Sequence, residues 1–149
     1  MQTSCEVPDE AYTVPLGQAE IKRAGADLTI VATGRLVLDA LDAAKELGAQ
    51  GVEAEIIDPR TLSPLDMDSI LASVRKTNRV VVAHEAVRNC GIGAEIAARI
   101  ADEAFDYLDA PVKRVTAPHT PVPYNKGLEE AFMPNPDDVV GTVMTMLGR

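Results

Sequence analysis

The sequence lacks tryptophan, and its only aromatic residues are three tyrosines and two phenylalanines. Its core must therefore be aliphatic, which is typical of parallel sheets buried on both faces. No apolar run approaches the roughly 20 residues that a membrane-spanning helix needs. The first residues, MQTSCEVPDE, contain neither the basic segment nor the apolar core of a secretion signal. We therefore expect no contact with a membrane.

Cysteine and positive charge are also scarce. The two cysteines, Cys5 and Cys90, show no metal-binding spacing, which favours free thiols in a reducing cytoplasm. The 23 acidic residues outnumber the 14 basic ones and give a formal net charge of −9. Because nonspecific nucleic-acid binding needs a basic surface, we expect no nucleic acid as a partner. The charge permits a basic protein partner, although solubility alone also accounts for it.

What the chain does contain is enough apolar sequence for one folded domain, with 46% hydrophobic residues in 149. Apolar runs of strand length alternate with segments of helical periodicity. This alternation predicts an α/β fold, a three-layer α/β/α sandwich around a mostly parallel sheet. Residues 1–26 read as an extended N-terminal arm, and residues 27–149 as the α/β domain. Within these we expect strands at 27–33, 52–57, 79–84 and 112–116, helices at 35–50, 65–75, 91–105 and 136–147, and a helical turn within 125–132.

The segment RVVVAHEAVRNCGIGAEIAARI (79–100) holds the most informative polar residues. His84 and Glu85 stand where a buried strand ends, the edge of a parallel sheet at which ligands or partners bind. Neighbouring strand residues point to opposite faces, so the pair is unsuited to joint acid–base catalysis. Glu85 better fits bonding to loop amides or to a neighbouring subunit. Gly91 and Gly93 open the next helix, where backbone N–H groups could hold a phosphate.

That phosphate motif is incomplete, because Ile96 occupies the place of its third glycine. Close packing of the helix therefore explains the two glycines better than ligand binding does. Arg60, in the Asp58–Thr61 turn, leaves two interpretations open. Its guanidinium could bind an anion, or it could form a salt bridge or carbonyl contact at a subunit interface.

Several unlike segments occur together in one order: TVPLGQAEIKRAGADLTIVATG, DPRT at 58–61, GIGAEIAARI, and PVPY at 121–124. In these the chain resembles the C-terminal domain of transketolase-type enzymes. Within that group it is most similar to the beta subunit of the decarboxylating component of 2-oxo acid dehydrogenase complexes, over about residues 7–149. The resemblance implies a five-stranded mixed sheet with one antiparallel edge strand, supplied by residues 19–22. Too few residues precede Val7 to hold the rest of such a subunit, which leaves two interpretations open: a fragment of a longer subunit, or a natural short subunit.

The same resemblance implies a function for the whole enzyme. Such an oxidoreductase uses thiamine diphosphate and magnesium to decarboxylate pyruvate, a branched-chain 2-oxo acid or acetoin, and passes the acyl group to a lipoyl arm. The Gly-Asp-Gly stretch that holds the cofactor through its metal is absent here. The carboxylate that activates the cofactor belongs to the preceding domain. We therefore expect no catalytic, cofactor-binding or metal-binding residue in this chain, which should be inactive by itself.

Association is the role that the resemblance leaves to this chain. The implied partners are a second copy in a homodimer, the alpha-type subunit, the remaining beta-type domain, and the acyltransferase component. Docking of the acyltransferase component is expected at Asp109 and at the terminal carboxylate of Arg149. Interface or loop-structuring roles are expected for a further set: Arg60, Glu85, Gly91, Gly93 and Tyr124.

One residue departs from the family pattern, and two other functions stay open. His119 stands where the family commonly has aspartate, which puts a carboxylate role there in doubt. The first alternative is a free-standing subunit of a split transketolase-like enzyme. The second is a regulatory domain that binds a small anion at Gly91, Gly93 and Arg60.

Overall fold

The computed structural model describes residues 6–149, so Cys5 and the expectation of a free thiol there lie outside the described residues. Five strands form one sheet in the order β1-β3-β2-β4-β5. β1 runs antiparallel to β3, and the other neighbouring strands are parallel. This confirms the expected mixed sheet with one antiparallel edge strand. The strands are β1 (Glu20–Arg23), β2 (Leu28–Ala32), β3 (Ala54–Asp58), β4 (Val80–Val87) and β5 (Lys113–Ala117).

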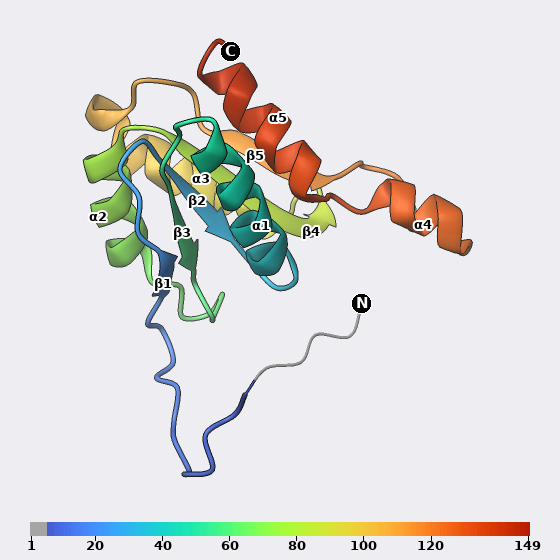
Figure 1. The fold of residues 1–149 in the computed structure, drawn as a ribbon, viewed down its shortest axis with the longest axis horizontal. Helices are drawn as coiled ribbons and strands as arrows, with labels where there is room; N and C mark the ends of the chain where they lie inside the picture. The colour runs from blue at the N-terminus through green and yellow to red at the C-terminus, as the bar shows by residue number, and fades with distance from the viewer. Residues whose placement is uncertain (1–5) are drawn as a thin grey trace.

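Helices cover both faces of the sheet, which confirms the three-layer α/β/α sandwich (Figure 1). α1 (Leu36–Ala49) and α5 (Pro136–Met146) pack on one face, over a core that includes Ile30 and Ile56. α2 (Met67–Thr77) and α3 (Ile92–Glu103) pack on the other, over a core that includes Val31 and Ile57. Successive residues of β2 thus point to opposite layers, and every residue of that strand is buried.

Two departures from the expected boundaries have clear local causes. β4 continues three residues beyond His84, because a bulge lets Val87 pair with Ala117 after His84 has paired with Thr116. α2 begins at Met67 rather than Leu65, because Asp66 is its N-cap. The Asp66 carboxylate accepts a hydrogen bond from the Ser69 amide at 3.1 Å.

Two segments project from the sandwich. The arm before β1 runs below the body in the view of Figure 1, and α4 (Lys126–Phe132) extends from the right side. A short 3₁₀ helix, η1 (Phe105–Tyr107), lies in the connection between α3 and β5. Across residues 6–149, no helix has the length and apolar character needed to cross a bilayer.

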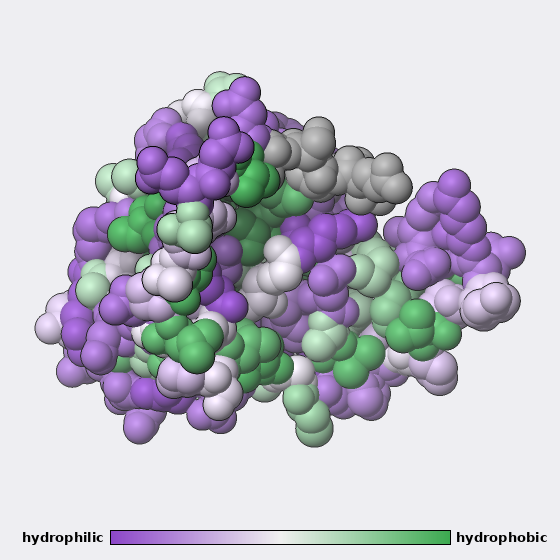
Figure 2. Space-filling model, turned by 90° about the horizontal axis from the view of Figure 1, so that it is seen from below, coloured by the Kyte–Doolittle hydropathy of each residue, from purple (hydrophilic) through white to green (hydrophobic). Residues whose placement is uncertain are grey.

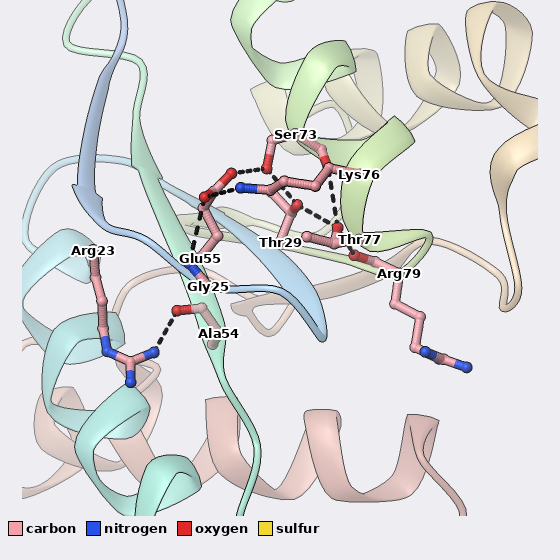
Figure 3. A network of polar contacts seen from close by, with 9 residues as sticks. All are labelled: Arg23, Gly25, Thr29, Ala54, Glu55, Ser73, Lys76, Thr77 and Arg79. Atoms are coloured by element: carbon pink, nitrogen blue, oxygen red, sulfur yellow. Dashed lines mark hydrogen bonds and ion pairs between the residues drawn. The ribbon is translucent and has the colours of Figure 1, made fainter.

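A buried carboxylate joins β3 to α2 (Figure 3). The side chain of Glu55 is 1% exposed. It accepts a hydrogen bond from the Ser73 hydroxyl at 2.6 Å and is ion-paired with Lys76. The amide of Gly25 donates to the same carboxylate at 3.4 Å. Three donors therefore compensate for the removal of this charge from water.

The network continues through hydroxyl groups into the centre of the sheet (Figure 3). Thr29, on β2, lies 2.6 Å from the Ser73 hydroxyl and 2.7 Å from the Thr77 hydroxyl. All three side chains are buried. α2 is thus fixed to both β2 and β3 by polar contacts as well as by its apolar face.

Candidate docking surface

The connection between α3 and β5, residues 104–112, forms the surface around Asp109. It is fixed to the C-terminal end of α2 by Asn78, which adopts a left-handed conformation with φ of 61°. The Asn78 side-chain amide donates to the Tyr107 carbonyl at 2.7 Å, and the Asp109 amide donates to the Asn78 carbonyl at 2.8 Å. The guanidinium of Arg75 lies 5.6 Å from the centre of the Tyr107 ring. The connection is therefore held in a defined shape although it is a surface loop.

Asp109 presents its carboxylate at the surface of this loop. The carboxylate lies 3.1 Å from the Arg79 guanidinium, and the Asp109 side chain remains 54% exposed. A groove of about 450 Å³ runs beside it, lined mainly by apolar side chains. Those side chains come from α3, η1 and the loop: Ala97, Ala101, Phe105, Leu108, Ala110, Pro111 and Val112. A charged group at the rim of an apolar groove suits a partner with a basic side chain next to an apolar one.

The C-terminal end of the chain lies at the same end of the molecule as the connection between α3 and β5 (Figure 1). α5 runs back along β5, so that Thr145 lines the same groove as Val112 at the start of that strand. Beyond the helix, the Arg149 amide donates to the Met144 carbonyl at 3.0 Å, and the residue is exposed. The fold thus brings the two expected docking residues to the N-terminal edge of the parallel strands.

His84 lies at the opposite edge and is buried rather than available for chemistry. Its side chain is on the α3 face of β4, and neither ring nitrogen has a hydrogen-bond partner among the described residues. A methyl group added at Gly93 would come within 2.3 Å of the ring, and one at Gly91 within 2.6 Å. The two glycines therefore let α3 approach the imidazole closely, and the ring fills the space beside them.

Burial lowers the pKa of His84, and the nearby positive charge of Arg114 lowers it further. The folded protein thus takes up a proton here less readily than the unfolded chain does. The stability that the neutral His84 ring contributes is fully present above the ordinary histidine pKa of about 6.5, and it is lost as the pH falls below that value.

We therefore expect the free energy of unfolding to fall between pH 7.5 and 5.5, with a slope of up to about 1.4 kcal/mol per pH unit from this group. His84→Gln should reduce the slope. Urea denaturation of the two proteins at each pH provides the measurement. Equal slopes for His84→Gln and the unmodified protein would contradict this role of burial.

The other expected site residues take separate positions. The Arg60 guanidinium is ion-paired with Glu20 of β1, so a carboxylate of the same chain already neutralises its charge. Glu85 follows His84 and lies beside Gly34, where an added methyl group would be 3.1 Å from its carboxylate. Tyr124 is fully exposed, in the loop that precedes α4. Arg60 and Glu85 lie at the edge opposite to Asp109, because Arg60 follows β3 and Glu85 lies near the C-terminal end of β4.

The comparisons with known proteins agree with this fold. The family model for the transketolase C-terminal domain matches residues 17–139. This chain belongs to that family. The split gene transketolase described as an inactive beta4 tetramer has the same fold, with a TM-score of 0.79 and 31% identity. That alignment covers 95% of this chain and 44% of the solved one.

Two relatives of this transketolase C-terminal domain come from Bacillus subtilis (strain 168). The beta subunit of acetoin:2,6-dichlorophenolindophenol oxidoreductase is 52% identical over 97% of this chain and 42% of that protein. The beta subunit of the pyruvate dehydrogenase E1 component is 47% identical over 95% of this chain and 43% of that protein. The chain therefore spans less than half the length of these relatives and corresponds to the C-terminal part of such beta subunits.

Sequence reasoning missed two features of the candidate docking surface in this transketolase C-terminal domain. One is the pairing of Asp109 with Arg79, which stand 30 positions apart in the sequence and meet only because both lie at the start of parallel strands. The other is the apolar groove. Exposed Phe105 and Tyr107 close to Asp109 are the signal that could have indicated it.

Proposed function

We propose that this chain is the assembly and docking domain of a thiamine-diphosphate-dependent oxidoreductase of the 2-oxo acid or acetoin dehydrogenase type. Its partners in that enzyme are a second copy, the alpha-type subunit, the remaining beta-type domain and a basic domain of the acyltransferase component. The observation that carries the proposal is the exposed Asp109 carboxylate, held by Arg79 at the rim of an apolar groove. We also infer a cytoplasmic location.

The similarity to beta subunits at about 50% identity supports this proposal, since those proteins are named as subunits of larger enzymes. The geometry of the surface supports it as well. The Asp109 carboxylate is an exposed negative group at the N-terminal edge of the parallel strands, in a chain of formal net charge −9, and a basic domain would be attracted to it. The direct experiment is co-elution of this chain with the acyltransferase component on a sizing column. Separate elution at low salt and micromolar concentrations would overturn the docking role.

The anion-binding alternative has less support from the geometry. Arg60 is paired with Glu20, and the imidazole of His84 fills the space beside Gly91 and Gly93. The split-enzyme alternative is favoured by the structural likeness to a split gene transketolase. A neighbouring reading frame that encodes a cofactor-binding chain with a Gly-Asp-Gly stretch would distinguish it from a beta-subunit origin.

The cofactor requirement gives the first prediction of this proposal. We expect no saturable heat when thiamine diphosphate and magnesium are titrated into the purified chain, and no decarboxylase activity, because the sequence lacks the Gly-Asp-Gly stretch. In the full enzyme the cofactor would be held by other domains. Saturable binding at micromolar cofactor would show that this chain takes part in cofactor binding itself.

Self-association gives the second prediction. Hydrophobic residues interrupt the polar surface at several places on the face shown in Figure 2. The exposed ones include Tyr12, Val14 and Leu16 in the arm, and Val122 and Leu128 near α4. Exposed apolar surface of this kind favours burial against another chain, so we expect at least a dimer. Sedimentation equilibrium at several concentrations measures this, and a strict monomer at the highest concentration would contradict it.

A further inference from the structure

Within residues 6–149, no strand lies beside the outer edge of β5. β5 is the last strand of the sheet and, among these residues, pairs only with β4, so they supply no ladder partner for its outward backbone N–H and C=O groups. The opposite edge is different, because the pairing of β1 is interrupted by an irregularity between Ile21 and Arg23. β5 pairs in register with β4 over four consecutive residues, from Lys113 to Thr116. It is therefore the edge better suited to receive another strand.

A groove follows this edge between β5 and α5. Its larger part has a volume of about 660 Å³ and reaches from Val112 beside Thr145 to the first turn of α5. A second part of about 280 Å³ continues past Thr116 and Asp138. The start of α5 thus lies near the end of β5, and the end of α5 near the start of β5. The groove leaves room for a chain to approach the free edge.

The two sides of the groove carry opposite charges. Lys113 stands at the start of β5, on the same face of the strand as Val115, which is buried under α1 and α5. Asp137 and Asp138 stand in the first turn of α5. Lys113 and Asp137 take part in none of the ion pairs found within residues 6–149. Each is therefore free to pair with a group on another molecule.

These positions are complementary to themselves under a two-fold rotation. If two β5 strands pair antiparallel, the start of each strand lies against the end of the other. The first turn of α5 lies near the end of β5, so Lys113 then comes opposite the partner's Asp137. The rotation creates each contact twice. An unrelated peptide would not in general carry a negative group and a positive group at the positions that match Lys113 and Asp137.

We propose that a second copy of this chain docks at the β5 edge, so that two sheets join through antiparallel β5 strands with Lys113 facing the partner's Asp137. The proposal rests on the self-association proposed above and identifies the surface through which the two copies make contact. It places a contact of that dimer on the strand edge beside α5.

A charge-swap experiment on the full chain tests this contact. Lys113→Glu and Asp137→Lys should each raise the dimer dissociation constant about tenfold or more, because each places like charges opposite one another twice. The double variant carrying both changes should restore the dissociation constant to near that of the unmodified chain. Since the two single variants shift the net charge in opposite directions, weakening by both cannot come from net charge.

Sedimentation equilibrium provides the dissociation constants, and Lys45→Glu, an exposed change on α1, is the matched control that should leave dimerisation unchanged. Unweakened dimers in both single variants, or a double variant that stays weakened, would overturn the β5 contact while leaving self-association intact. A strict monomer for the unmodified chain would overturn the self-association itself. Circular dichroism of each variant establishes that it is folded.

Discussion

Replacing Glu55 by alanine should lower the free energy of unfolding by about 1–3 kcal/mol, because buried donors lose the carboxylate that accepts their hydrogen bonds. The hydroxyl of Ser73 and the amide of Gly25 lose their acceptor in the interior, while the half-exposed Lys76 is left to water. Urea denaturation followed by circular dichroism measures the change. An unfolding free energy within about 0.5 kcal/mol of the unmodified protein would contradict a stabilising network.

The pH dependence of the same group provides an independent check. Burial by itself would raise the pKa of Glu55, but hydrogen bonds from Lys76, Ser73 and Gly25 outweigh it and bring the pKa below the ordinary value of 4.5. The stability that the carboxylate contributes is therefore present above pH 4.5 and is lost as the pH falls through the lowered pKa. Glu55→Gln keeps the size of the side chain and should show a smaller loss of stability in this acid range than the unmodified protein.

Asp109→Lys should weaken binding of the basic domain of the acyltransferase component without unfolding this chain. The reversal replaces an attraction with a repulsion at the rim of the apolar groove, and the loss should reach about 2 kcal/mol if the contact is desolvated. Loss of the exposed pair with Arg79 should cost at most about 1 kcal/mol of stability. Surface plasmon resonance at low and high salt measures the affinity. Unchanged affinity at both salt concentrations would show that docking occurs elsewhere.

Two control variants separate charge from loop shape. Arg79→Gln removes the partner of Asp109 within the chain but leaves the Asp109 carboxylate in place, so binding should weaken less than in Asp109→Lys. Asp42→Lys makes the same charge reversal on the exposed face of α1 and should also leave binding unchanged. If Arg79→Gln weakened binding as much as Asp109→Lys, the shape of the loop rather than its charge would be responsible.

The layers of the fold could be predicted from the sequence because periodicity reports burial directly. β2 and the first half of β4 are runs of apolar residues buried on both faces, and helical segments with an apolar face stand between the strands. The antiparallel β1 came only from the family resemblance, since its two central residues, Ile21 and Lys22, are both exposed and its sequence, EIKR, has no strand pattern. The extension of β4 depends on a bulge, which the pairing with β5 creates and local sequence does not encode.

Polar contacts between distant residues were the least predictable part. Glu55 stands in an expected strand, yet nothing near it in the sequence indicates that Ser73 and Lys76, one helix later, will compensate its burial. The surface position of Asp109 could be inferred from its polar turn. The hydrogen bond that Asn78 accepts from the Asp109 amide could not be inferred, because it depends on the positive φ of Asn78 at the end of α2. Local patterns thus predict elements, and contacts between elements decide the site.

Hydrogen–deuterium exchange of this chain with and without the basic domain of the acyltransferase component tests the docking role most directly. The proposal predicts slower exchange on binding in peptides that cover residues 104–112 and the end of α5, at the edge that holds Asp109 and Arg149. It predicts no change in residues 85–93, at the opposite edge of the sheet. Protection confined to residues 85–93, or no protection at saturating partner, would contradict the docking surface proposed for this domain.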